Sequence, residues 1–198
     1  MLYDANSEIS LLFCAGDSLL SRTIRWGLKE PASHVALDVP GSQAVIHSDL
    51  LGLHLDKRCD FMAAHEIVSR FRIRLTARSQ IQVSAKLLRY VNSTHEDYDF
   101  GAFAGLTVAA IKSRLTGVPF PRTSPWGNDR ELLCTEIAYL LNQALVEVTG
   151  RILLKYDTEL DALSPWRLYQ LLREQVGGQD EIDFRMVPSP TPSGGHVV

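Results

Sequence analysis

Apolar and polar residues alternate along short stretches in the first part of the chain. Residues 9–14 form an apolar run, and residues 35–39 and 44–48 form two more, separated by a Pro-Gly turn. Within residues 67–75, apolar positions alternate with arginines, which is typical of a strand with one buried and one exposed face. The pattern therefore predicts strands over these stretches, the last with a basic outer face.

Helical signals separate and follow the predicted strands. Asp17, after Gly16, is a candidate N-cap for a helix that runs to about Leu28. Ser164 followed by Pro165 is a typical helix start, and that helix is predicted to end near residue 174. The remaining elements predicted from periodicity are helices over 81–91, 100–115 and 132–148 and a closing strand over 182–186.

Strands in the first half, mixed with separate helices, predict an α+β fold in which an antiparallel sheet packs against helices. A chain of 198 residues is long enough for one domain with a sizeable core. We place this domain at residues 5–186. Residues 187–198 are rich in Pro, Ser and Gly, and we expect them to be a disordered tail.

The composition is that of an ordinary globular protein, with 45% apolar residues, 22% charged residues and a net charge of −3. This balance gives no indication of nucleic acid as a partner. No signal peptide begins the chain, and no apolar stretch approaches the roughly 20 residues of a membrane-spanning helix. We therefore expect a cytoplasmic protein, with delivery by lysis or a phage particle as an alternative. The odd number and wide spacing of Cys14, Cys59 and Cys134 argue against a disulfide framework.

Two histidines lie in the predicted hairpin. Side chains alternate between faces along a strand, so the loop length decides whether His34 and His47 share a face. An even loop puts both imidazoles on one polar face and leaves a fully apolar face for the core, whereas an odd loop separates them. Because the apolar pattern favours the even loop, we expect the two rings to lie side by side.

Cys134 is the candidate nucleophile. Only the thiolate attacks near pH 7, so a catalytic cysteine needs a base, and that base needs a third polar group to orient it. Taken alone, a cysteine on an amphipathic helix is usually a small core residue, and a single strand histidine is usually an ordinary polar residue. The core interpretation applies to Cys14 and Cys59.

Four short segments occur in an order that resembles a known family. They are Ser-His-Val-Ala-Leu at 33–37, Val-Ile-His at 45–47, Tyr-Asp-Phe at 98–100 and Leu-Cys-Thr-Glu-Ile at 133–137. The chain is similar in this respect to the permuted NlpC-like cysteine hydrolases, the branch that includes YiiX-type proteins and lecithin:retinol acyltransferase relatives. The resemblance spans about residues 10–170, and it implies a circularly permuted, papain-like fold with the nucleophile on a helix.

The resemblance also implies residue roles. Cys134 is the nucleophile and the only activated thiol, His34 is the general base, and His47 orients His34. Tyr98 matches the family tyrosine near the oxyanion site. Should His47 not fill the third position, Asp38 or Asp49 would be the alternative.

The chain departs from the family pattern around Cys134. Thr135 replaces the usual serine, and no capping residue immediately precedes the cysteine. Asn128 with Glu131 could form a capping box instead, which would place Cys134 in the second helical turn. Residues 111–128 look like an insertion that could serve as a lid or substrate loop.

The function implied by the resemblance is hydrolysis of an amide, ester or thioester bond through a Cys-His-His triad and an acyl-enzyme. The alternatives are a lipid acyltransferase or thioesterase, and a catalytically silent binding module on the same scaffold. The expected partner is a peptide or an acyl-containing substrate, and no cofactor is expected. Cell-wall peptides, lipid acyl groups and protein conjugates remain open as substrates.

A metal site is a further alternative. His47, His54, Cys59 and His65 are all ligand types, but their spacing fits no standard ligand pattern. We therefore expect no metal.

A basic stripe runs along and just after the predicted strand over 67–75. It consists of Arg70, Arg72, Arg74 and Arg78. Such stripes are usually solvated faces. The alternative is contact with an anionic substrate or a transient contact with anionic lipid.

Overall fold

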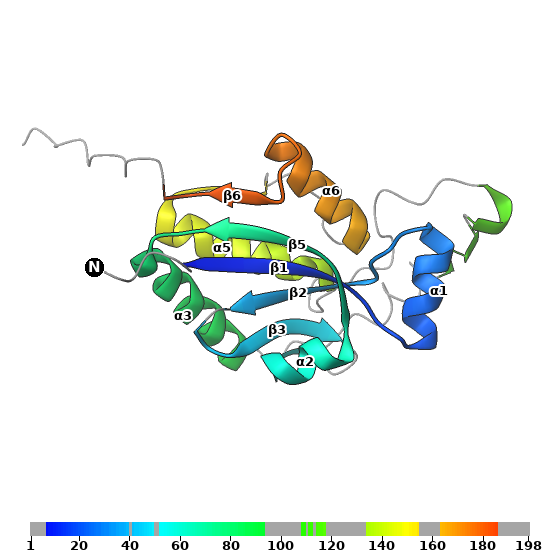
Figure 1. Ribbon diagram of the computed structural model, residues 1–198, viewed down its shortest axis with the longest axis horizontal. Helices are drawn as coiled ribbons and strands as arrows, with labels where there is room; N and C mark the ends of the chain where they lie inside the picture. The colour runs from blue at the N-terminus through cyan, green and yellow to red at the C-terminus, as the bar shows by residue number, and fades with distance from the viewer. Residues whose placement is uncertain are drawn as a thin grey trace, which may run out of the picture.

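The computed structural model contains one six-stranded sheet with helices packed around it (Figure 1). The structure describes residues 7–39, 41–49, 52–93, 108–109, 111–112, 114–117, 134–154 and 163–185. The strand order is β4-β3-β2-β1-β5-β6. Neighbouring strands are antiparallel except β5 and β6, which are parallel. A mixed fold of sheet and helices, as the sequence predicted, is therefore confirmed.

Most of the elements match those predicted from the sequence, and two that were not predicted are present, β4 and α2. In chain order the elements are β1 (Glu8–Ala15), α1 (Leu19–Leu28), β2 (His34–Val39), β3 (Ala44–Asp49), β4 (Gly52–Lys57), α2 (Arg58–Ala64), β5 (Glu66–Arg74), α3 (Ala77–Ser93), the 3-10 turn η1 (Cys134–Glu136), α5 (Ile137–Thr149), α6 (Pro165–Gln175) and β6 (Glu181–Asp183).

The β2–β3 hairpin has the even register that the apolar pattern favours. Val39 pairs with Ala44 across the loop, and Ala36 pairs with His47. Because alternate residues share a face, His34 lies on the same face as Ala36 and His47. The prediction for this hairpin is confirmed.

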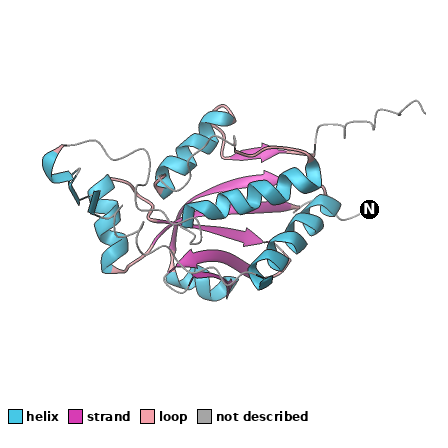
Figure 2. Cartoon of the chain, turned by 180° about the vertical axis from the view of Figure 1, so that it is seen from behind, coloured by secondary structure: helices cyan, strands magenta, loops and turns pink. Residues whose placement is uncertain are grey.

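The opposite face of the sheet forms the main core. Figures 1 and 2 view the molecule from opposite sides, and both place α3 and α5 on one side of the sheet. Apolar residues of these helices and of α6 pack against alternate positions of β1, β2 and β5. The members from the strands include Ile9, Leu11, Phe13, Val35, Leu37, Val39, Phe71 and Ile73, all fully buried.

A smaller apolar cluster lies on the histidine face. It contains Leu12, Cys14, Ala36, Val45 and Phe61, the last from α2. A register shift in the β1–β5 pairing turns Ile67 towards this cluster. The sequence pattern placed Ile67 on the same face as Phe71, and that placement is wrong because the shift reverses the alternation.

Helix capping agrees with the sequence at α6 and differs at α1. Ser164 caps α6, and its hydroxyl accepts a hydrogen bond from the Arg167 N–H. The cap of α1 is Ser18, whose hydroxyl accepts from the Ser21 N–H, and not Asp17 as predicted. Both residue types are good N-caps, so their order along the chain cannot decide between neighbours.

A buried amide fixes the chain after α5. Asn142 is 2% exposed, and its Oδ1 accepts hydrogen bonds from the backbone N–H groups of Leu153 (2.7 Å) and Leu154 (3.0 Å). Buried backbone donors are costly when unpaired, so this single side chain stabilises the exit from the helix.

The basic stripe on β5 is partly neutralised inside the fold. Arg72 and Arg74 both form ion pairs with the Glu181 carboxylate of β6, at 3.2 and 2.9 Å. The stripe therefore helps to hold the parallel edge strand, in addition to facing solvent.

Several sequence predictions lie outside the described residues. These are Tyr98, most of the helix predicted over 100–115, the Asn128–Glu131 capping box, most of the insertion at 111–128, and the tail at 187–198. In the described part of the chain, no helix is long and apolar enough to cross a membrane.

Candidate active site

His34 and His47 meet on one face of adjacent strands, as the register predicted. Their ring centroids are 5.4 Å apart, and the rings meet edge to face. His47 is 2% exposed, whereas His34 is half-buried with its Nε2 enclosed. Among the described residues no hydrogen bond joins the two rings, so His47 does not orient His34 directly in this conformation.

Aromatic rings from α2 and the following residue enclose this pair. Phe61 lies 5.0 Å from His47 and 4.2 Å from His65 between ring centroids. His65 in turn stacks on His34 at 5.7 Å. The helix α2 thus covers the two histidines, a feature the sequence pattern did not predict.

β4 adds two polar side chains to the same face. His54 pairs directly with His47 across β3 and β4, with ring centroids 4.2 Å apart. The Asp56 carboxylate accepts a hydrogen bond from His47 Nε2 at 3.0 Å. The signal for this strand was present, because Leu53 and Leu55 alternate with His54 and Asp56.

Asp38 and Asp49, the alternatives to His47 as the residue that orients His34, contact other side chains. The Asp38 carboxylate is 2% exposed and pairs with the Arg58 guanidinium at 3.1 Å. Asp49 lies 3.7 Å from His54 Nδ1. Arg58 contacts only Oδ2 of Asp38, and among the described residues no hydrogen bond joins Asp38 to His34.

Cys134 begins η1, the 3-10 turn that leads into α5, and is 9% exposed. The structure does not place it in the second turn of α5, because α5 starts only at Ile137. Backbone N–H groups of Val35, Cys134 and Thr135 lie near the sulfur. They favour the thiolate and so lower the pKa of the thiol. Since Val35 follows His34 directly, the thiol lies beside the first residues of β2.

The helix that follows the thiol and the imidazole ring nevertheless lie on different faces of β2, although Cys134 also interacts with Cys14, which pairs with His34. α5 packs on the face that carries Val35, whereas the His34 ring lies on the face that carries Ala36. No hydrogen bond joins Cys134 to His34 or His47 within the described residues, and His34 Nε2 has no partner. The hydrogen bond expected between these side chains is therefore not formed in this conformation.

Burial decides the protonation states of both groups. It raises the pKa of the Cys134 thiol to about 11, and the nearby N–H groups only partly offset this effect. Burial, followed by the neighbouring His47, His65 and His54, lowers the pKa of His34 well below its usual value. Both shifts disfavour charge, so the resting site holds a neutral thiol and a neutral imidazole, not an ion pair.

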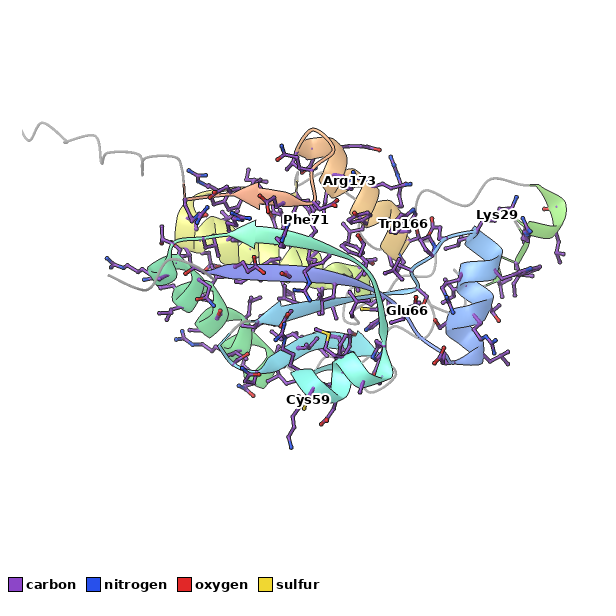
Figure 3. The ribbon with its side chains drawn as sticks, viewed as in Figure 1. Lys29, Cys59, Glu66, Phe71, Trp166 and Arg173 are labelled. Atoms are coloured by element: carbon purple, nitrogen blue, oxygen red, sulfur yellow. The ribbon has the colours of Figure 1, made fainter. Side chains whose placement is uncertain are left out.

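The other cysteines differ in exposure. Cys14 is fully buried, and burial raises the pKa of its thiol to about 12. Cys59 is exposed, and its thiol donates to the Asp60 carboxylate at 3.3 Å. Figure 3 shows Cys59 at the outer edge of α2, pointing away from the sheet.

Serine hydroxyls tie α1 to the strand that carries His34. Ser21 Oγ and Ser33 Oγ share a hydrogen bond of 2.5 Å, and Ser21 Oγ also accepts from the Gly16 N–H at 3.0 Å. A Cβ at Gly16 would lie 3.3 Å from Ser21 Oγ, which explains a glycine at this close approach. These contacts fix the start of β2, where His34 and the thiol lie.

A cavity of about 220 Å³ lies away from these residues, between α3 and α5. Its lining includes Leu87 and Tyr90 from α3 and Leu140 and Ala144 from α5. None of the predicted site residues lines it, so it is separate from the candidate active site.

No protein-family model matches the chain, and no curated protein matches it.

Alkylation should measure how strongly burial lowers the reactivity of the Cys134 thiol. We expect iodoacetamide to label exposed Cys59 first at pH 7. The thiolate is the reactive form, so labelling of Cys134 should rise about tenfold per pH unit from pH 7 towards the raised pKa. Peptide mapping by mass spectrometry gives both rates in one sample. A Cys134 rate that exceeds that of Cys59 at pH 6 would instead support the activated thiolate expected from the sequence.

Proposed function

We propose that the chain is a thiol hydrolase of the permuted, papain-like type, acting on an amide, ester or thioester bond. Cys134 is the nucleophile, His34 the general base, and His47 a positioning residue that acts through its edge-to-face ring contact with His34. The observation that carries the proposal is that η1 packs beside β2, so that the Cys134 thiol lies close to the start of the strand that carries His34. The order of the four motifs along the chain supports the same assignment.

The neutral states of the two groups favour general-base catalysis over a preformed ion pair. The thiol proton passes to a His34 ring nitrogen as the sulfur attacks the carbonyl carbon. The tetrahedral oxyanion is stabilised by backbone N–H groups at the start of η1. His34 then gives the proton to the departing amine, alcohol or thiol, which leaves an acyl-enzyme.

The second half of the reaction regenerates the thiol. Water attacks the acyl carbonyl, His34 accepts its proton, and the carboxylic acid leaves as the sulfur is reprotonated. Transfer to an alcohol or amine in place of water would make the protein an acyltransferase. Both halves require the His34 ring to reach the sulfur, and this needs a change in the ring's orientation at the start of β2.

Trapping the acyl-enzyme tests the proposal. A Cys59→Ser variant, which lacks the exposed thiol, is incubated with p-nitrophenyl acetate, quenched in acid and mapped by mass spectrometry. We expect one acetyl group on the peptide that contains Cys134. The same background with His34→Ala should acquire little or no acetyl group in the same time.

The outcomes separate the alternatives. An acetyl group on Cys134 that is released faster by an added amine or alcohol than by water indicates a transferase. No acetyl group on Cys134, in a variant whose circular dichroism matches that of the native chain, indicates a binding module and overturns the proposal.

A further inference from the structure

We propose that His47, Asp49 and His54 form a binding site for a divalent transition-metal ion of the kind that imidazole favours, such as zinc. The three residues lie on one face of the β3–β4 hairpin, with His47 opposite His54 and Asp49 two positions further along β3. Each offers one ligand atom, and these atoms all lie within 4.8 Å of one another.

The tautomer of His47 leaves one ring nitrogen with a lone pair that can bind a metal ion. A carboxylate can only accept a hydrogen bond, so the contact with Asp56 at 3.0 Å assigns the proton to His47 Nε2. In a neutral imidazole the other nitrogen, Nδ1, then carries the lone pair. Nδ1 is buried without a hydrogen-bond partner, which is costly unless something else satisfies it. A metal ion would satisfy it.

A hydrogen bond also sets the tautomer of His54. Its Nδ1 lies 2.9 Å from the Gly52 carbonyl oxygen, which can only accept, so Nδ1 carries the proton. Nε2 is then the nitrogen with the lone pair. A carbonyl or carboxylate that holds the second nitrogen of a histidine is the usual support of a metal ligand, because it fixes the ring and raises its basicity.

The partial exposure of His54 and Asp49 makes the site accessible to an ion from solvent. His47 is 2% exposed, but the side chains of His54 and Asp49 are 26% and 42% exposed. Two imidazoles and one carboxylate suit zinc and its neighbours in the first transition series, whereas calcium and magnesium prefer oxygen ligands. Three protein ligands would also leave one coordination position open to solvent.

This ligand set differs from the one considered from the sequence. Cys59 points away from the sheet and bonds to Asp60, and His65 is not part of the group. The missing ligand was Asp49, which lies two positions beyond His47 on the same face of the hairpin and belongs to the same group of ligand atoms. The expectation that no metal binds rested on sequence spacing, and that spacing did not show the pairing of β3 with β4.

Calorimetric titration of the metal-free full chain with zinc chloride tests the site. We expect one zinc ion per chain, and at least about tenfold weaker binding for Asp49→Asn and for His54→Gln. Asp56→Ala removes the hydrogen bond that supports His47 and the carboxylate that lies 3.9 Å from His54 Nε2, and it should weaken binding by about ten- to a hundredfold. Cys59→Ser and His65→Gln are the matched controls and should bind zinc like the native chain.

Cobalt substitution reports the ligand type. The site should give a cobalt spectrum without a thiolate-to-metal charge-transfer band. Such a band, or native zinc affinity in both Asp49→Asn and His54→Gln, would overturn the proposal, as would the absence of zinc binding. Cys134→Ser should bind zinc normally, so failure of the thiol hydrolase proposal and failure of the metal site are separately visible.

Discussion

Replacement of Cys134 by alanine should lower turnover of an activated ester by at least about a thousandfold, because no other group in the proposed mechanism can form the acyl-enzyme. His34→Ala should cause a similar loss, since the burial-raised pKa of the thiol leaves little thiolate at neutral pH without a base. His47→Ala should lower turnover less, because His47 acts only through His34.

Steady-state rates on p-nitrophenyl esters measure all three losses. The matched control is Cys59→Ser, which removes the exposed thiol and should keep native turnover. The His34→Ala and His47→Ala losses should not multiply in the double variant, because both act through one imidazole. Full turnover by Cys134→Ala would remove the thiol from the mechanism, and multiplicative losses would show that the two histidines act independently.

Replacement of Phe71 by alanine should lower the free energy of unfolding by about 3–5 kcal/mol. Phe71 is fully buried, pairs with Leu11 across β1 and β5, and lies in the core between the sheet and its helices (Figure 3). The neighbouring strands cannot close around so large a void, so the variant loses both burial and packing contacts.

Urea unfolding followed by circular dichroism gives this change from the shift of the midpoint at constant slope. The control is Ile81→Ala on α3, where the side chain is 66% exposed and the expected change is below about 0.5 kcal/mol. A loss at Phe71 as small as that at Ile81 would mean that β5 does not contribute to the core.

The alternation of apolar residues was enough to predict the part of the sheet that holds the histidines. Val35, Leu37 and Ile46 had to face the core, and with an even loop this placed His34 and His47 together on the other face. Apolar runs and alternation also predicted β1 and most of β5, and the Ser164-Pro165 pair predicted the start of α6. These features depend on neighbours in the chain, for which a local pattern carries the information.

The partners of the β4 strand could not be predicted from local patterns. The direct pairing of His54 with His47, and of Asp56 with the His47 ring, exists only because β4 joins the sheet edge beside β3. The alternation of Leu53 and Leu55 with polar residues indicated a strand, but not its place in the sheet.

The position of Cys134 was decided by tertiary packing. The sequence predicted Cys134, His34 and His47 as candidate site residues, and it set the shared face of the two histidines. It did not determine that α5 would cover the opposite face, or that burial would leave both thiol and imidazole neutral. Which face a helix covers depends on how all the apolar surfaces of the chain pack together, and the residues around one cysteine do not encode that choice.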